Sequence, residues 1–113
     1  MDCPIRQQLS VNIFCKIIEG EIPSTKIFEN DYVIAIKDIN PKAKVHCLVI
    51  PKLHVESLNE LEDETIMSEI LKGVKEVAKI MNVKAYRVHV NTGKEEGQIV
   101  FHLHFHVLSN TLN

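Results

Sequence analysis

Histidine and apolar residues alternate from Phe101 to Val107 within the segment IVFHLHFHVL, at residues 99–108. Successive side chains of a β-strand point to opposite faces of a sheet, so this period of two predicts a strand with two different faces. One face carries His102, His104 and His106. The other face packs against the protein interior with four apolar side chains: Phe101, Leu103, Phe105 and Val107. The fold must therefore contain a sheet that displays imidazoles on one side.

Other segments supply the remaining strands of this sheet. The segments TKIFEN and YVIAIKD are rich in β-branched and aromatic residues and flank a turn at Asn30 and Asp31, which predicts a hairpin. The mostly apolar VHCLVIP is expected to be a central third strand, and AYRVHVN a fourth. With the histidine strand as the fifth, short turns between the strands favour an antiparallel sheet.

Two helices are expected. The segment NIFCKIIEGEIP predicts a two-turn helix, capped by Asn12 and ended by Pro23, with one apolar face formed by Ile13, Phe14, Ile17 and Ile18. A long helix is predicted from about Leu61 to Met81, where apolar residues recur every three or four positions. Together with the strands, this gives an α+β fold in which helix covers one face of the sheet.

Length and composition limit the classes of protein that fit. The 113 residues suit a single domain, which we place at residues 11–113 after a polar leader at residues 1–10. A formal charge of −2 without a basic patch argues against nucleic acid polymers as partners. There is no apolar run long enough for a membrane span and no secretory signal, so we expect a cytoplasmic protein, with the nucleus as a further location. The three separated cysteines are expected to be reduced.

The histidine face has three interpretations. Solvent-facing polar residues are the plainest one, although three identical side chains in register favour a function. A shared metal is the second, but a rise of ~3.3 Å per residue puts His102 and His106 ~13 Å apart, too far for both to bind one zinc ion. The third is phosphorus chemistry, with neutral His104 as nucleophile and its neighbours as donors to phosphate oxygens.

The sequence also resembles a known family. The segment QIVFHLHFHVL is similar to the histidine triad (HIT) signature, and three longer segments follow the Hint-like branch of that family in order and spacing: NIFCKIIEGEIPSTKIFEND, KDINPKAKVHCLVIPKLHVESLNEL and VNTGKEEGQIVFHLHFHV. The resemblance covers nearly the whole chain after Ser10. It implies a five-stranded antiparallel sheet with two helices, a homodimer whose sheets join, and hydrolysis or transfer of nucleotidyl phosphates.

The resemblance also implies roles for individual residues. His104 matches the nucleophile that attacks the α-phosphorus, His106 contacts phosphate oxygens and assists the leaving group, and His102 orients the row. Two further histidines match positions that border the site and can relay protons: His46 and His54. The nucleotide-binding matches are Asn91, Gly97 and Gln98 for the phosphate, Asp38 for the ribose hydroxyls, and Ile13, Phe14, Ile17, Ile36 and Ile39 for the base.

Several of these residues have another interpretation when the resemblance is set aside. Asp38 is equally suited to a turn before Asn40 and Pro41. His46 lies in an apolar strand, where a hydrogen-bonded core histidine is usual, and His54 follows a proline in a loop where exposure is expected.

Gln98 is an even number of residues from each of the three histidines, so it would point to their side of the strand if the strand began there. The aliphatic residues of the first helix are also suited to a plain core. His89 has no role in the resemblance and is assigned to the surface or to a dimer contact.

Three departures from the family pattern bear on activity. Ile99 stands at a nucleotide-site position where many relatives carry Ser or Thr, so we expect acid assistance to be weaker or to run through His106. The chain ends at SNTLN without the glycine pair and the extension that shape the substrate entrance in many relatives. Some relatives bind structural zinc through a cysteine pair near the first helix. Here Asn12 occupies the first of these positions and only Cys15 remains, so no metal is expected.

The sequence therefore favours an enzyme that hydrolyses purine nucleotide conjugates of the nucleoside 5′-phosphoramidate type through a covalent nucleotidyl-His104 intermediate. It releases a nucleoside monophosphate such as AMP and needs no cofactor. A dinucleoside polyphosphate hydrolase or nucleotidyl transferase is the alternative within the same family. The alternatives in other classes are a nucleotide-binding adaptor with little turnover and a metalloprotein.

Overall fold

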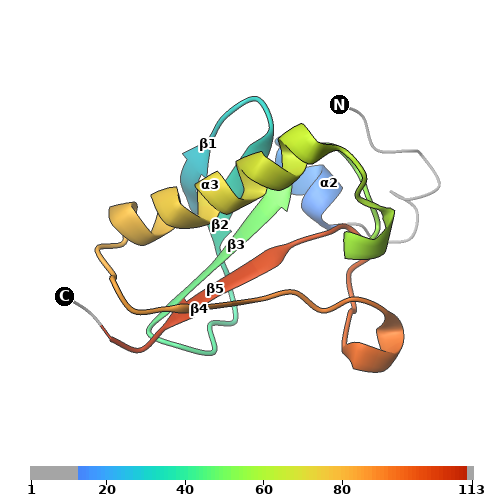
Figure 1. Ribbon diagram of the computed structural model, residues 1–113. Coiled ribbons are helices and arrows are strands. Elements are labelled where there is room, and N and C mark those ends of the chain that lie inside the picture. Colours follow the sequence, from blue (N-terminus) through green and yellow to red (C-terminus); the bar gives the residue numbers. More distant parts are fainter. Residues whose placement is uncertain (1–12, 112–113) are drawn as a thin grey trace.

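The computed structural model describes residues 13–111, and these form a five-stranded antiparallel sheet with the strand order β1-β2-β3-β5-β4 (Figure 1). The strands are β1 Lys26–Glu29, β2 Val33–Lys37, β3 Val45–Pro51, β4 Arg87–His89 and β5 Phe105–Ser109. The helices are α2 Ile13–Ile18 and α3 Glu64–Ile80, with single 3₁₀ turns at Leu58–Glu60 and Lys94–Glu96. This architecture confirms the expected α+β fold, including the hairpin and the central third strand.

The central strand β3 is buried on both faces, because a helix covers each side of the sheet. Its residues Val45, Cys47 and Val49 face α3 and belong to the main core with apolar residues of that helix. Leu48 and Ile50 face the other way and pack with Phe14 and Ile17 of α2 in a second, smaller core. The expectation of helix on one face is therefore incomplete, since the short helix covers part of the opposite face.

The long helix α3 begins slightly later than the apolar spacing indicates. Asp63 caps it by accepting a hydrogen bond from the backbone N–H of Ile66 at 3.0 Å, and the preceding turn at Leu58–Glu60 is a separate 3₁₀ segment. Gly73 lies where the helix approaches the sheet. A Cβ added there would come within 3.1 Å of Val49 Cγ1 and 3.3 Å of Val33 Cγ2, so a larger residue would force the helix away from the sheet.

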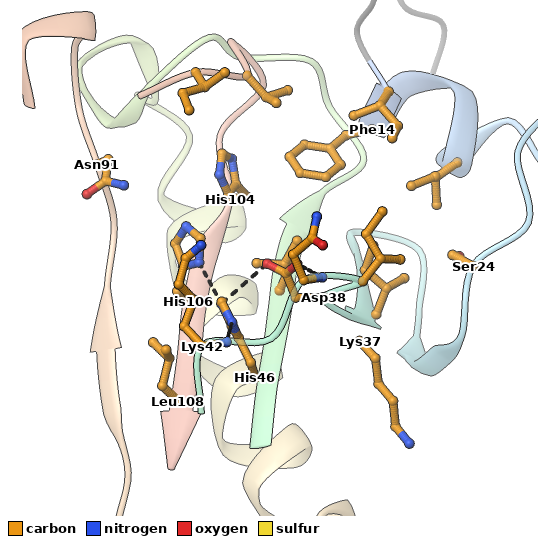
Figure 2. Close-up of a pocket in the computed structure, with 18 of the residues that line it drawn as sticks. Phe14, Ser24, Lys37, Asp38, Lys42, His46, Asn91, His104, His106 and Leu108 are labelled. Carbon is orange, nitrogen blue, oxygen red and sulfur yellow. Dashed lines mark hydrogen bonds and ion pairs between the residues drawn. The ribbon is translucent and has the colours of Figure 1, made fainter. Parts of the chain in front are cut away.

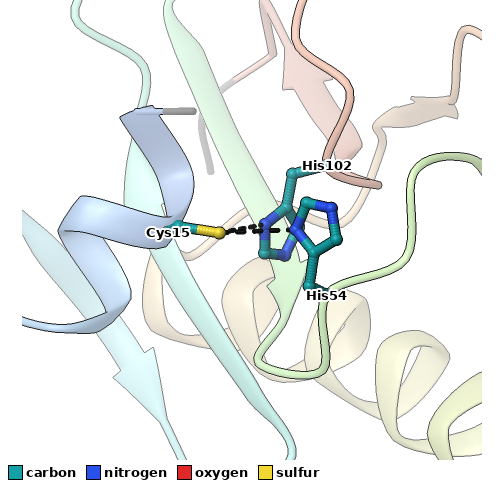
Figure 3. Close-up of side chains that lie close together, drawn as sticks. All are labelled: Cys15, His54 and His102. Carbon is teal, nitrogen blue, oxygen red and sulfur yellow. Dashed lines mark hydrogen bonds between the residues drawn. The ribbon is translucent and has the colours of Figure 1, made fainter. Parts of the chain in front are cut away.

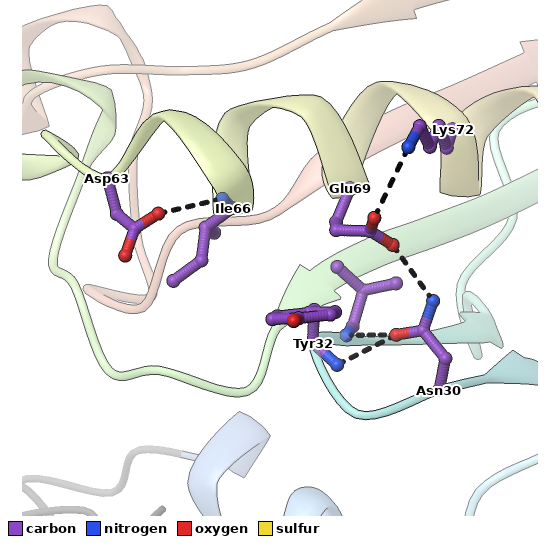
Figure 4. A network of polar contacts seen from close by, with 7 residues as sticks. Asn30, Tyr32, Asp63, Ile66, Glu69 and Lys72 are labelled. Atoms are coloured by element: carbon purple, nitrogen blue, oxygen red, sulfur yellow. Dashed lines mark hydrogen bonds and ion pairs between the residues drawn. The ribbon is translucent and has the colours of Figure 1, made fainter.

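Asn30 joins the first hairpin to α3 (Figure 4). Its Oδ1 accepts hydrogen bonds from the backbone N–H groups of Tyr32 and Val33, at 2.8 and 2.9 Å, which closes the turn. Its Nδ2 donates to Glu69 on α3 at 3.2 Å. The turn residue expected from sequence therefore also fixes the position of the helix over the hairpin.

The histidine segment is a strand only in its second half. The strand β5 begins at Phe105, so the prediction of a strand from residue 99 is wrong for residues 99–104. In the β3–β5 register, Val49 faces Phe105, and the next pair on this face would set Pro51 against Leu103. Proline has no N–H to donate, and its carbonyl instead accepts a hydrogen bond from the ring Nε2 of His102 at 2.8 Å. The ladder ends there for that reason.

The segment before β5 is held by the loop that follows β3. The backbone N–H of Leu103 donates to the carbonyl of Val55 at 2.8 Å, which keeps Leu103 in the main core. His102 is completely buried, whereas Phe101 is 38% exposed. The expectation that Phe101 packs with the other apolar residues of the segment is therefore wrong, because the chain bends before it reaches the strand.

The remaining sequence expectations have different outcomes. Asn12 and the boundary between leader and domain lie outside the described residues, so both stay predictions. Cys47 is a free, buried cysteine, but Cys15 is disulfide-bonded, so the expectation of three reduced cysteines is wrong for Cys15. Within residues 13–111, the helices lack the combination of length and apolar character that a membrane span needs.

Candidate active site

A pocket of ≈ 640 Å³ lies on the sheet face that α2 partly covers (Figure 2). Its floor is a row of cross-strand neighbours, in which Ile36 of β2 pairs with Leu48 of β3, Leu48 with His106 of β5, and His106 with His89 of β4. Paired residues of an antiparallel sheet share a face, so the register alone places these four side chains together. The volume is in the range of pockets that hold small ligands, about 300–1,000 Å³.

One end of the pocket is apolar. Helix α2 contributes Ile13, Phe14 and Ile17, and the sheet contributes Ile36. Ile39 also lines the pocket but is 82% exposed, so it stands at the mouth rather than in the wall. The structure thus brings together all five residues that the sequence assigns to the base, and three of them, Phe14, Ile17 and Ile36, also belong to the smaller core.

Asp38 follows β2 at the edge of this apolar end. Its Oδ1 accepts a hydrogen bond from the backbone N–H of Asn40 at 2.8 Å, and its Oδ2 lies 3.4 Å from His46 Nε2. The turn interpretation of Asp38 is therefore confirmed, and its assignment to the ribose hydroxyls stays a prediction. One oxygen shapes the turn, while the other faces the histidines in the pocket.

The tautomer of His104 follows from a single contact. Its Nδ1 lies 2.8 Å from the backbone carbonyl of His102, and a carbonyl oxygen can only accept, so Nδ1 must carry the hydrogen. In the neutral ring this leaves a lone pair on Nε2. His104 lines the pocket, and the ring of Phe14 packs edge-on against it with 4.8 Å between centroids. The backbone and Phe14 hold the ring with one basic nitrogen available.

A backbone contact also sets the tautomers of the His46–His106 pair. The N–H of Lys42 donates to His46 Nδ1 at 3.0 Å, so the hydrogen of the neutral His46 ring is on Nε2. That Nε2 lies 2.9 Å from His106 Nδ1 and donates to it, which leaves His106 with its own hydrogen on Nε2 (Figure 2). The pocket therefore holds a ring with a lone pair on Nε2, His104, next to a ring with N–H at Nε2, His106. Their centroids are 5.0 Å apart.

Three of the pocket histidines, His46, His104 and His106, favour the neutral form at physiological pH. Burial lowers the pKa of His46 and of His104 below the ordinary histidine value. Burial, followed by the nearby rings of His104, His89 and His46, lowers the pKa of His106 to about 4. The neutral form is the one that can attack phosphorus, so the environment favours the form that nucleophilic catalysis needs.

His102 and His54 lie outside this pocket. They gather with Cys15 in a separate cluster beneath α2, where Cys15 Sγ is 3.3 Å from His54 Nδ1 and 3.5 Å from His102 Nδ1 (Figure 3). His54 is half-buried rather than exposed as expected. The structure thus separates the histidines predicted for catalysis into two groups, and the buried His102 acts on the pocket through its carbonyl contact with His104.

Two groups of donors are close enough to be considered for a metal ion. In the first, donor atoms of Cys15, His54 and His102 lie within 4.8 Å of one another. Zinc binds cysteine as the thiolate, and the sulfur of Cys15 is in a disulfide, so this set does not fit zinc. In the second group, Asp38, His46 and His106, the facing nitrogens of the two rings already share a hydrogen bond. The expectation of no metal stays a prediction.

The loop before the histidine segment places its four predicted residues differently. Asn91, Gly97 and Ile99 line the pocket, with Ile99 86% exposed. Gly97 has a φ of 97°, a left-handed conformation that glycine adopts without strain. Gln98 is buried and braces the loop, because its side chain bonds to the backbone of Gly93, Glu56 and Val100. It is not a pocket residue, since the strand on which its parity was counted begins later.

Sequence reasoning did not assign Lys42, Arg87 or His89 to the site, although all three line the pocket. His89 and Asn91 are two residues apart, so the predicted strand would direct both side chains to the same face, and this spacing could have indicated that His89 belongs to the site. The same spacing extends to Arg87. The contribution of Lys42 to the histidine tautomers is made by its backbone N–H, which no side-chain pattern reveals.

Buried His102 should make the stability of the fold depend on pH. Burial lowers its pKa to about 4, below the value of about 6.5 in an unfolded chain. Stability is therefore complete above about pH 6.5 and is lost as the pH falls towards 4, by about 3 kcal/mol for this residue. Urea unfolding at several pH values should show this decline. His102→Phe should be less stable at pH 7 but decline less steeply, and an unchanged slope would contradict the assignment.

Comparison with known proteins places the chain among relatives of similar length. Residues 19–112 match the family model described as HIT domain. An uncharacterized HIT-like protein of Helicobacter pylori is 46% identical over 101 residues, which cover 88% of this chain and 96% of that protein. An adenosine 5′-monophosphoramidase of Schizosaccharomyces pombe is 44% identical over 96 residues, covering 85% and 71%. A HIT family hydrolase from Clostridium thermocellum superposes with a TM-score of 0.84 at 46% identity, covering 88% and 90%.

Proposed function

The chain belongs to the HIT domain family, and we propose that it hydrolyses purine nucleotide conjugates at the α-phosphate, with nucleoside 5′-phosphoramidates as substrates and a nucleoside monophosphate such as AMP as product. The observation that carries this proposal is the orientation of His104. Its Nδ1 is bonded to a backbone carbonyl, and its basic Nε2 is left for the pocket. The name of the Schizosaccharomyces pombe relative supports the same substrate class.

The pocket suits a nucleotide because its apolar end, its carboxylate and its phosphate-binding residues follow the order of base, ribose and phosphate in a nucleotide. The apolar end accepts a flat base against Phe14 and the neighbouring isoleucines, and Asp38 beside it offers an acceptor to ribose hydroxyls. Asn91 and the backbone near Gly97 are close enough to each other to hold phosphate oxygens between them, since a Cβ on Gly97 would lie 3.9 Å from Asn91. A bound nucleotide would thus place its α-phosphate beside His104.

The reaction divides into two balanced steps. In the first, the lone pair on His104 Nε2 forms a bond to phosphorus, and the P–N bond of the substrate breaks with its electrons leaving on the amine. Binding of the anionic phosphate raises the pKa of His106, so that its ring first takes up a proton from solvent at Nδ1 and becomes cationic, while the N–H of His46 turns to Asp38 Oδ2. The departing amine then takes the Nε2 proton of His106, which returns to the neutral form. In the second, water attacks phosphorus, its proton passes to His106, and the bond to His104 breaks to restore the neutral ring.

A comparison of substrates tests this activity. The purified protein should release AMP from adenosine 5′-phosphoramidate faster than from diadenosine tetraphosphate, measured as kcat/KM by chromatography. Faster cleavage of the tetraphosphate would favour a dinucleoside polyphosphate hydrolase. Tight binding of AMP with negligible turnover of both compounds would favour a nucleotide-binding adaptor.

We also propose that two copies pair through the edge strand β4. This strand has one neighbour, β5, and all three of its residues are exposed. Its free edge presents unpaired backbone groups that a second sheet can bind. Sedimentation velocity at micromolar concentration should give a mass of twice the 12.9 kDa chain. A monomer at all concentrations up to the millimolar range would contradict the pairing.

A further inference from the structure

The end of the pocket opposite the apolar wall is basic. Lys42, Arg87 and His89 all line it. Arg87 and His89 come from β4, where they pair with Leu108 and His106 of β5, so the register directs both side chains to the pocket face of the sheet. Lys42 comes from the loop before β3 and lies beside His46 (Figure 2). We call these three residues, which come from two segments distant in sequence, the basic subsite.

The basic subsite adjoins the groups that act on phosphorus. The ring of His89 stacks on that of His106, with centroids 4.4 Å apart and planes inclined by 20°. The charges of His89, Lys42 and Arg87 all act on His46, lowering its pKa in addition to the larger effect of burial and against the opposite effect of Asp38. The subsite therefore lies within electrostatic reach of the His46–His106 pair.

The two permanent cations of the subsite have no anionic partner in the described part of the chain. The ion pairs formed there by lysines involve Lys26, Lys52 and Lys72, whereas Lys42 and Arg87 form none. Asp38 is the one acidic residue that lines the pocket, and its oxygens are directed to the Asn40 backbone and to His46. The chain as a whole has a net charge of −2, so this concentration of cations does not reflect a basic protein.

We infer that the basic subsite binds a negatively charged group on the leaving side of the substrate. The inference rests on the proposed function, which puts the nucleoside at the apolar end and phosphorus at His104. The leaving group then extends towards β4, because the other side of the pocket is occupied by the base. A carboxylate on a departing amine and a phosphate of a departing nucleotide share the required chemistry, and both fit an arginine with a neighbouring lysine.

Equilibrium binding tests the subsite without any turnover. ADP has one phosphate more than AMP on the leaving side, so wild-type protein should bind ADP more tightly in calorimetry. The double variant Lys42→Ala/Arg87→Ala should lose about tenfold in ADP affinity and less than about twofold in AMP affinity. The Lys42 substitution keeps the backbone N–H that bonds His46. Lys84→Ala removes an exposed lysine that does not line the pocket and should change neither affinity. Equal losses for AMP and ADP, or no loss for either, would overturn the inference.

Kinetics then identify the source of the charge. Three adenosine conjugates are compared: a phosphoramidate of propylamine, a phosphoramidate of glycine, and diadenosine tetraphosphate. The double variant should lose about tenfold more in kcat/KM on the anionic leaving groups than on propylamine. A loss confined to glycine identifies a carboxylate, and a loss confined to the tetraphosphate identifies a phosphate. A loss of the same size on propylamine would contradict the subsite. Absence of turnover in wild type would refute the proposed function and leave the ADP–AMP comparison to decide the subsite.

Discussion

His104→Ala should abolish turnover of adenosine 5′-phosphoramidate, with kcat reduced by about 10⁴-fold or more, because it removes the basic Nε2 that the backbone contact of the ring leaves for the pocket. His106, the nearest alternative, carries its hydrogen on Nε2 and shares its other nitrogen with His46. Affinity for AMP should change by less than about threefold, since the apolar wall and Asp38 remain. The measurements are steady-state kinetics and calorimetry with AMP on the same preparation.

The His104 variant needs a control for the loss of a packed ring. Phe14 lies against His104, so alanine also removes an aromatic contact. His104→Phe keeps a ring of similar size without a nucleophile and should be as inactive as the alanine variant. If His104→Phe or His104→Ala kept more than about a tenth of the wild-type kcat, nucleophilic attack by this residue would be excluded.

His106→Ala should lower kcat for the same substrate by about 10²–10⁴-fold, the range typical of general acid–base catalysis. The amine cannot leave without a proton, and His106 is the residue whose Nε2–H is held beside His104 by the hydrogen bond from His46. A nitrophenyl ester of AMP provides the discriminating comparison, because nitrophenolate leaves as a stable anion. With that substrate the loss should be about tenfold or less.

The comparison of leaving groups also separates acid catalysis from a structural effect. A merely structural role for His106 would reduce turnover of the amine and the nitrophenyl substrate by the same factor. His46→Phe offers a matched variant, since it removes the donor to His106 Nδ1 without replacing His104 or His106. It should show a smaller loss than His106→Ala with the same bias towards the amine substrate. Equal losses on both substrates would contradict the assigned role.

Most of the fold could be predicted from sequence because local pattern and tertiary packing agree there. The turn at Asn30 and the mostly apolar strand from Val45 to Pro51 are where the residue types indicate. The histidine segment differs. Its alternation correctly places Leu103 and Val107 in the main core, but the ladder stops at Pro51, a residue distant in sequence. The length of a strand depends on its partner, which the alternation of the strand itself does not reveal.

The site was predictable in its residue types but not in its grouping. His104, His106, His46 and Asp38 meet in the pocket, whereas His54 and His102 meet near the disulfide-bonded Cys15. Side-chain patterns also cannot reveal the backbone groups that set the tautomers, namely the carbonyl of His102 and the N–H of Lys42. Gln98 shows the same limitation, because its bonds to three backbone groups exist only once the loop is folded.

The most direct test is to trap the covalent intermediate. Wild-type protein and His104→Gly are mixed briefly with a phosphoramidate of adenosine labelled in the base, denatured at neutral pH and analysed by peptide mass spectrometry. The expected result is an acid-labile adenylyl group on the peptide that contains residue 104 in wild type, at the position of His104, and its absence from the glycine variant. An adduct that persists in His104→Gly, or that maps to another histidine in wild type, would contradict attack by His104.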